Sequence, residues 1–223
     1  LMSKKRSYVG YLLAIVIIAI LITAVIILTY FETKSQVRVP GVSVGDTFTY
    51  DIIGFWNVSA VNSTIPQRIL DMNQTAAFRV TITNVTGPMV TTRETWIFKN
   101  GTEYNSTSMI NVETGYNTGG FWPIVAANLG KNDLLHPTGQ NKIAVNETVI
   151  RQYASGPRET NYFKLQYTGR DEDYGYYTAE VDYYFDKATG MLVELYDASN
   201  FISMGTQGAI WWKLKESSVW KVS

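Results

Sequence analysis

The chain contains one uninterrupted apolar stretch, and this stretch limits what its N-terminal part can become. From Tyr8 to Tyr30 the sequence carries neither a charged residue nor a proline. As a helix it would be about 34 Å long at about 1.5 Å per residue, enough to cross a hydrocarbon core of about 30 Å. Aromatic residues gather towards its ends, as they do at membrane interfaces. The stretch therefore predicts a transmembrane helix over residues 8–31.

Basic residues before the stretch set its expected orientation. The segment KKR at residues 4–6 precedes it directly, and positive charge favours the cytoplasmic side of a membrane. The apolar core of a cleaved signal peptide is shorter, about 7–15 residues, and ends in a small-residue site that is missing here. We expect an uncleaved signal anchor, with a cytoplasmic tail over residues 1–7, a linker over residues 32–40 and an extracellular domain over residues 41–223.

A second use of the same helix stays open. In archaeal type IV pilins, a short basic leader is cleaved just before the hydrophobic helix, and the helices then bundle into a filament core. In this chain the cut would fall between Arg6 and Ser7. A charged segment followed by an apolar helix is typical of a filament subunit as well as of a signal anchor.

Acceptor motifs for N-linked sugar are frequent in the rest of the chain. The pattern N-x-S/T, without a central proline, occurs at seven of the fourteen asparagines: Asn57, Asn62, Asn73, Asn84, Asn100, Asn105 and Asn146. A used acceptor must lie at the surface, because the sugar is bulky and solvated. No acceptor follows residue 148. Either the C-terminal strands are more buried, which is the interpretation we favour, or one face is left bare for a partner.

Alternation of polar and apolar residues predicts the fold of residues 41–223. Period-two patterns rich in Thr, Val and aromatic residues are typical of antiparallel strands. They occur in TFTYDIIGFW, AAFRVTITNV, VTTRETWIF, NYFKLQYTG, YYTAEVDYYF, MLVELY and GAIWWKLK. Tight hairpin turns are expected at Asn100-Gly101 and over Asp186–Gly190. The predicted fold class is mainly β: an N-terminal transmembrane helix and one antiparallel β ectodomain, as a curved sheet, a sandwich or a half-barrel.

Two segments lack this alternation and are predicted to be short helices packed against the sheet. One lies near Arg68–Met72. The other is FWPIVAANLG at Phe121–Gly130, where Pro123 would occupy the first helical turn, a position that proline tolerates well.

Several stretches together resemble a group of uncharacterised archaeal membrane-anchored surface proteins. They are GVSVGDTFTYDI, ANLGKNDLLHP followed by NETVIRQYASGPRETNYFKL, and YYFDKATGMLVELY, and they cover most of residues 41–198. These motifs are turns and strand entrances, so they specify a fold more than a chemistry. The resemblance implies an extracytoplasmic, N-glycosylated archaeal protein with a β-rich ectodomain, and it supplies no catalytic residue.

The composition excludes several kinds of active site. With no Cys and with His136 as the only histidine, one chain cannot assemble a His/Cys zinc site. A Ser-His-Asp triad would need His136, and the sequence contains neither the nucleophile-elbow motif nor a phosphate-binding loop. A lone His beside proline is usually a loop residue. We therefore predict no enzyme, no cofactor and no metal.

Acidic residues offer weaker hypotheses. Asp171 and Asp173 have the spacing of calcium ligands, but the third ligand and the distal Glu are missing, so a solvated turn is favoured. Glu180, Asp182 and Glu194 lie on hairpin faces and could pair as glycosidase acids. Spacing alone does not show that they do so.

Two adjacent tryptophans, Trp211 and Trp212, are the best candidates for contact with a partner. Successive side chains of a strand point to opposite faces. If one of the two fills the core, the other must lie on the outer face.

The sequence as a whole predicts a single-pass cell-surface protein with a structural or binding role in the archaeal envelope. Its expected partners are the lipid bilayer, further copies of itself or other envelope proteins. The mildly acidic outer domain argues against nucleic acid. Two alternatives remain: a subunit of an extracellular filament, joined through the helix or through strand exchange, and a half-barrel carrier of an apolar ligand.

Overall fold

The computed structural model describes residues 17–23, 38–57, 65–172, 174–202 and 205–223. The chain divides into two compact units, residues 1–37 and residues 38–223.

Little of the first unit is described. Residues 17–23 form a helix whose side chains are all exposed. The rest of the predicted transmembrane helix over residues 8–31, the predicted tail over residues 1–7 and most of the predicted linker lie outside the described residues. Within the described ranges, no helix combines the length and the apolar character needed to span a bilayer.

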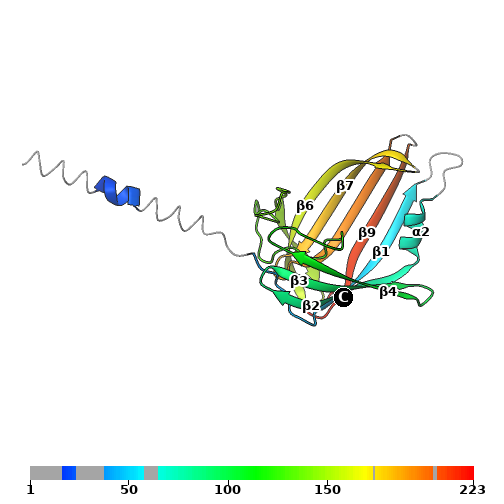
Figure 1. The fold of residues 1–223 in the computed structure, drawn as a ribbon, viewed down its shortest axis with the longest axis horizontal. Coiled ribbons are helices and arrows are strands. Elements are labelled where there is room, and N and C mark those ends of the chain that lie inside the picture. Colours follow the sequence, from blue (N-terminus) through cyan, green and yellow to red (C-terminus); the bar gives the residue numbers. More distant parts are fainter. Residues whose placement is uncertain (1–16, 24–37, 58–64, 173, 203–204) are drawn as a thin grey trace, which may run out of the picture. The chain divides into compact units, whose positions relative to one another are not determined.

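The second unit is mainly β, as predicted, and its described residues form one antiparallel sheet of nine strands (Figure 1). The strand order is β4-β3-β2-β1-β9-β8-β7-β6-β5. The strands are β1 (Thr47–Asn57), β2 (Thr75–Thr86), β3 (Met89–Phe98), β4 (Glu103–Asn111), β5 (Glu147–Tyr153), β6 (Gly156–Asp171), β7 (Gly175–Asp186), β8 (Leu192–Phe201) and β9 (Thr206–Ser217).

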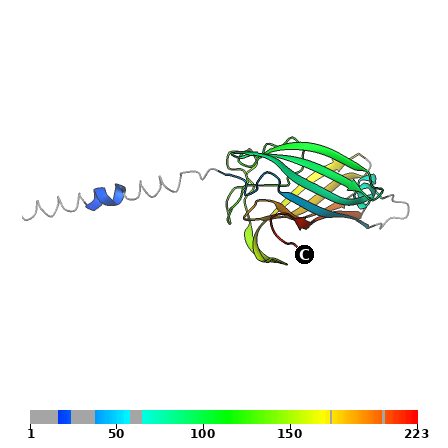
Figure 2. The ribbon, with the colours of Figure 1, turned by 90° about the horizontal axis from the view of Figure 1, so that it is seen from below.

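The sheet turns a corner between β1 and β2. Strand β1 pairs with β9 from Phe48 to Asn57, but with β2 only from Thr47 to Tyr50. Beyond this short pairing the two parts of the sheet diverge, so that β2, β3 and β4 cross over one face of the layer formed by β1 and β6–β9 (Figure 2). Packing of two layers at a large angle, with strands that turn at a corner, is a known solution for β proteins.

The alternating residues predicted for the core do fill the space between the two layers. In β1, Phe48, Tyr50 and Ile52 are buried, and the equivalent sets of β2 and β9 are buried with them. The Tyr50 hydroxyl donates a 2.8 Å hydrogen bond to the Leu192 carbonyl, and burial raises the pKa of this phenol far above its usual value. The inner face of the curved sheet is therefore occupied by the chain's own side chains.

An aromatic cluster joins the layers at their centre. The Trp212 ring lies 5.1 Å from the Phe78 ring and 5.6 Å from the Trp96 ring, measured between centroids, and stacks on Phe121 at 4.7 Å. Each layer contributes to the cluster, because Trp212 belongs to β9 whereas Phe78 and Trp96 belong to β2 and β3. Aromatic pairs at such distances stabilise a core beyond the area they bury.

One of the two predicted short helices is present. Helix α2 (Gln67–Asn73) packs on the inner face of β1, and its Ile69 side chain is 2% exposed. A Cβ atom at Gly54 would lie 3.0 Å from the Ile69 side chain and 3.1 Å from its carbonyl oxygen. Glycine at this position therefore lets the helix approach the strand closely.

The helix predicted over Phe121–Gly130 is wrong. This segment forms no helix: residues 123–127 are buried and residues 127–128 form a turn. Its backbone pairs with residues near the hairpin between β7 and β8: Val125 N–H donates to the Gly190 carbonyl at 2.9 Å, and the Pro123 carbonyl accepts from Leu192 N–H at 2.8 Å. These tertiary hydrogen bonds satisfy the backbone groups that a helix would have paired internally. The apolar side chains face the core on consecutive positions, which hides any strand-like alternation.

The predicted hairpin over Asp186–Gly190 is confirmed. The Asp186 carboxylate accepts hydrogen bonds from the Thr189 N–H and hydroxyl, both at 2.8 Å. It also receives the Arg158 guanidinium at 2.7 and 2.9 Å. Gly190 has a φ of +76°, which favours glycine. The turn joins β7 to β8, and the Arg158 contact links it to β6.

Candidate functional site

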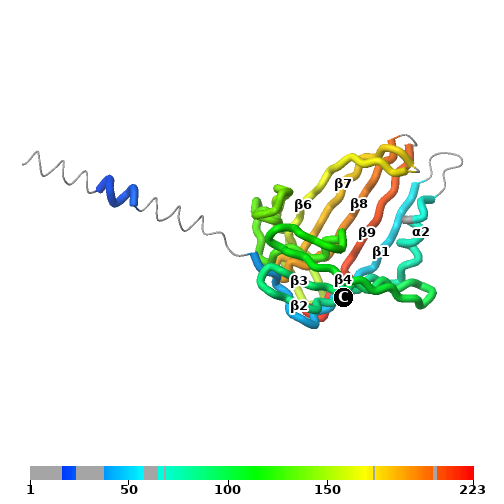
Figure 3. Tube along the Cα trace, in the orientation of Figure 1, coloured from blue at the N-terminus to red at the C-terminus, as the bar shows by residue number. Residues whose placement is uncertain are grey.

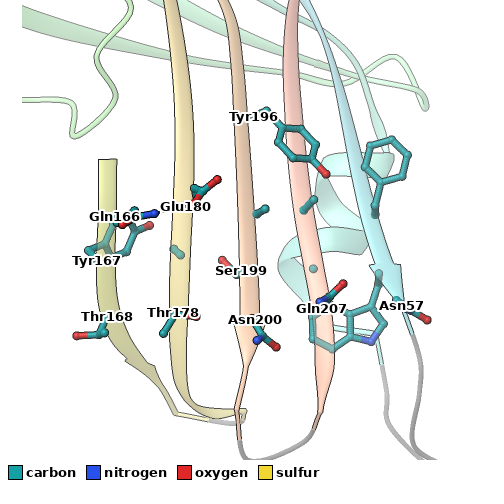
Figure 4. A pocket seen from close by; sticks show the side chains of 16 residues that line it. Asn57, Gln166, Tyr167, Thr168, Thr178, Glu180, Tyr196, Ser199, Asn200 and Gln207 are labelled. Carbon is teal, nitrogen blue, oxygen red and sulfur yellow. Dashed lines mark hydrogen bonds between the residues drawn. The ribbon is translucent and has the colours of Figure 1, made fainter. Parts of the chain in front are cut away.

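A groove of about 950 Å³ lies on the outer face of the sheet, opposite the core (Figure 4). Its position follows from alternation along the strands. In β9, Ile210 and Trp212 point into the core, so Gln207 and Ala209, which are three positions and one position before Ile210, belong to the outer face. The groove crosses β1, β9, β8, β7 and β6, which stand side by side in the sheet (Figure 3).

Small side chains form the floor of the groove and aromatic side chains border it. Ala209 of β9 pairs directly with Ala198 of β8. Phe55, paired with Ala209 on the other side, is 47% exposed, and Tyr196 of β8 is 39% exposed. Such exposed aromatic rings on a sheet face offer flat apolar surfaces to a ligand.

Ionised groups at the groove are paired with one another. Among the described residues that line it, Glu180 is the only charged one. Its carboxylate forms an ion pair with Lys164 and accepts a 2.7 Å hydrogen bond from Gln166. The hydrogen bond with Lys164, followed by that with Gln166, lowers the pKa of Glu180, which keeps the carboxylate ionised. The groove as a whole therefore presents little net charge.

The two candidate tryptophans lie on opposite faces of β9. Trp212 is 8% exposed in the aromatic cluster of the core. Trp211 lies on the outer face, where its ring N–H donates a 2.9 Å hydrogen bond to Glu194. Together with Phe55 and Tyr196, Trp211 borders a smaller hollow of about 340 Å³ beside the groove. If a partner binds here, only Trp211 of the pair is placed to contact it.

Most of the glycosylation candidates lie on the surface. Asn62 lies outside the described residues. Five of the others are exposed: Asn57, Asn84, Asn100, Asn105 and Asn146. They occupy the end of β1, strands β2 and β4, the turn between β3 and β4, and the entrance to β5. No acceptor occurs in β6–β9, the strands that supply most of the groove.

Asn73 differs from the other acceptors. Its side chain is half-buried between α2 and β1, where its amide nitrogen donates to the Gly54 carbonyl at 2.9 Å and its oxygen accepts from the Gly54 N–H at 2.8 Å. Because N-linked sugar attaches to this nitrogen, modification would disturb both hydrogen bonds. We expect Asn73 to be the least occupied of the described acceptors when glycopeptides are quantified by mass spectrometry. A fully occupied Asn73 would contradict this assignment.

His136 is buried rather than exposed in its loop. Its side chain is 3% exposed, Nδ1 lies 3.0 Å from the Val112 carbonyl, and the ring packs edge-on against Trp122. Within the described structure, Nε2 has no hydrogen-bond partner. Burial lowers the pKa of His136, so the neutral ring is the folded form. These contacts assign His136 a structural role.

The buried histidine predicts a pH dependence of stability. The pKa of His136 is lower in the folded chain than the unfolded value of about 6.5. The neutral ring therefore contributes fully to the free energy of unfolding above pH 6.5, and this contribution is lost as the pH falls. The variant His136→Asn keeps a donor near the Val112 carbonyl but has no titrating ring. When the free energy of unfolding is measured with urea between pH 7 and pH 5, it should fall less steeply in the variant than in the parent, by up to about 1.4 kcal/mol per pH unit. Parallel pH profiles for parent and variant would contradict a neutral buried ring.

The acidic candidates are engaged in local contacts. Asp171 accepts a 3.0 Å hydrogen bond from the Tyr174 N–H, as expected for a turn, whereas Asp173 lies outside the described residues. Within the described ranges there is no cluster of three metal-ligating side chains. Asp182 accepts from the Tyr162 hydroxyl at 2.7 Å, and Glu194 forms an ion pair with Arg151.

Sequence reasoning missed the groove, although one signal for it existed. In β1 the apolar residues Ile53 and Phe55 occupy the face opposite Phe48, Tyr50 and Ile52. A strand that is apolar on both faces near its end indicates that something beyond the core is to be covered or bound. Interpreting this signal required the register of the neighbouring strands, which the sequence alone does not give.

Comparison of the chain with family models, with curated proteins and with solved structures returns no match.

Proposed function

We propose that the chain is an N-glycosylated binding protein of the archaeal cell surface, anchored in the membrane by its N-terminal apolar stretch. The groove on the outer face of β1 and β6–β9 is its binding site. The observation that carries this proposal is the contrast between the two parts of the sheet. Exposed sugar acceptors lie on or beside β1–β5, whereas the sequence from β6 to β9 contains none and supplies most of the groove.

The position of the groove on the outer face favours a surface binding protein over a carrier that encloses an apolar ligand in a half-barrel. A half-barrel carrier would hold its ligand on the inner, aromatic face of the curved sheet. In this domain, Phe163, Phe185 and Trp212 are packed into the core of that face. A ligand would therefore bind on the outer face, where aromatic and polar side chains alternate.

A filament subunit remains the alternative proposal. Strand exchange would use β4 and β5, the edge strands of the described sheet. On β4, residues 116–118 already pair with the end of the strand at Met109–Asn111. Sugar on Asn105, near the start of β4, would stand beside one edge. At the end of β5, the Ala154 and Ser155 N–H groups donate to the C-terminal residues Val222 and Lys221. These features make exchange less favourable than groove binding.

Membrane-impermeant amine labelling of intact cells tests the proposed orientation. Lys99, Lys131 and Lys221 are exposed on the β domain, so all three should be labelled from outside without permeabilisation. A cytosolic lysine-rich protein provides the control for cell integrity. If these lysines are labelled only after permeabilisation, the proposed orientation is wrong.

A further inference from the structure

Five uncharged polar side chains form a continuous row across the groove. Register pairs Asn57 with Gln207, Gln207 with Asn200, Asn200 with Thr178, and Thr178 with Thr168. At about 4.8 Å between neighbouring strands, the row extends about 19 Å. Figure 4 shows these labelled side chains side by side across the five strands.

These side chains remain available to a ligand. All five are exposed, and among the residues that the structure describes, none of the five side chains is held by a hydrogen bond within the chain. Gln166, in the next row, contrasts with them because it already donates to Glu180. An unpartnered row of amides and hydroxyls supplies donors and acceptors together.

The next row supplies an apolar surface beside the polar one. It contains Phe55, Ala209 and Ala198 in register, with the Tyr196 ring from the adjacent row. The two alanines leave space that larger side chains would fill, and the aromatic rings rise at its border. A ligand that fits both rows must combine flat apolar faces with many hydroxyl groups.

Resting on the function proposed above, we propose that the groove binds a neutral carbohydrate chain laid across strands β1, β9, β8, β7 and β6. Pyranose rings present C–H groups on their faces, which stack on aromatic rings, and hydroxyls at their edges, which pair with amides. The length of the row favours an oligosaccharide over a single sugar.

Other ligand classes fit less well. An acyl chain would cover the five polar side chains without replacing their hydrogen bonds to water, which is unfavourable for each group. An anionic chain would meet Glu180 and no positively charged side chain among the described residues that line the groove. A peptide strand added to a sheet needs an edge, whereas the groove lies on a face.

Binding can be measured by titration calorimetry on the full chain in detergent micelles. The probes are linear neutral tetra- to hexasaccharides of β-1,4-linked glucose, mannose and galactose, with the matching monosaccharides, an oligogalacturonate and a fatty acid as comparisons. Because a sugar on Asn57 would compete at one end of the row, the measurements use Ser59→Ala, which removes that acceptor and keeps Asn57. At least one neutral oligosaccharide should bind with a Kd of about 1 mM or lower, and the monosaccharides should bind more weakly.

Two groove variants and one surface control assign the binding to this site. Asn200→Ala combined with Gln207→Ala should weaken binding by about tenfold or more, and Phe55→Ala by about tenfold. Gln140→Ala, which removes an exposed amide outside the groove, should leave binding unchanged. Each variant is first checked for an unaltered melting transition.

Two results would overturn the carbohydrate assignment. If no neutral oligosaccharide binds, the ligand class is wrong. If an oligosaccharide binds equally well to both groove variants, the groove is not its binding site. If instead the fatty acid or the oligogalacturonate binds, and Phe55→Ala abolishes this binding, the ligand is an apolar chain or an acidic sugar chain. In that case the groove would remain the binding site of the proposed function. The surface orientation itself is decided separately by the labelling of intact cells.

Discussion

Trp212→Ala is expected to lower the free energy of unfolding by about 3–5 kcal/mol, the range found when a large aromatic side chain is removed from a core. The side chain is buried between the two layers and contacts rings from β2, β3 and the Phe121 segment. Its removal leaves a cavity where the layers meet, and neighbouring rings can fill it only in part. Urea denaturation, followed by circular dichroism, measures the change.

Trp211→Ala is the matched control. The two tryptophans are neighbours in β9, but Trp211 is half-buried on the outer face and its main contact is the hydrogen bond to Glu194. We expect a loss of about 1 kcal/mol. Similar losses for the two variants would mean that the layers do not pack through Trp212 as described.

Arg158→Ala is expected to lower the free energy of unfolding by about 3 kcal/mol, because it leaves the buried Asp186 carboxylate without its counter-charge. The Asp186 side chain is 1% exposed and receives two Arg158 hydrogen bonds in parallel geometry. The same guanidinium lies 4.3 Å from the centre of the Trp220 ring, so its loss also removes packing. These contacts tie β6 and β7 to the C-terminal segment.

A second ion pair between neighbouring residues provides the control. Lys187 and Glu159 lie 3.0 Å apart, but the Glu159 side chain is 57% exposed, and Lys187→Ala should change stability by less than about 0.5 kcal/mol. Adding Asp186→Asn to Arg158→Ala should recover part of the loss, because it removes the unpaired charge. If Arg158→Ala is as mild as Lys187→Ala, the Asp186 carboxylate is solvated and the assignment of a buried ion pair is wrong.

Alternation predicted the strands that have one buried and one exposed face. In β1, β2 and β9, every second residue enters the core, so a period of two in the sequence was sufficient to identify both the strand and its inner face. Strands β4 and β5 were not predicted. They lie at the two edges of the sheet, and β4, with its Ser, Thr and Asn, buries few side chains, so the apolar signal is weak.

Features that depend on distant contacts were not predictable in this way. The segment Phe121–Gly130 has the composition of a short helix, but its backbone partners at Gly190 and Leu192 are far away in sequence. The corner between β1 and β2 forms because the two strands pair only from Thr47 to Tyr50 of β1, and the sequence does not show where this pairing stops. The groove likewise requires the register of five strands, because the row from Asn57 to Thr168 exists only when Gln207, Asn200 and Thr178 are aligned.

Glycopeptide mapping of the native protein from isolated membranes is the most direct test of the surface assignment. We expect sugar on the exposed acceptors Asn84, Asn100, Asn105 and Asn146, little or none on Asn73, and recovery of the chain with the membrane fraction. Recovery in the soluble fraction with every acceptor unmodified would contradict the account.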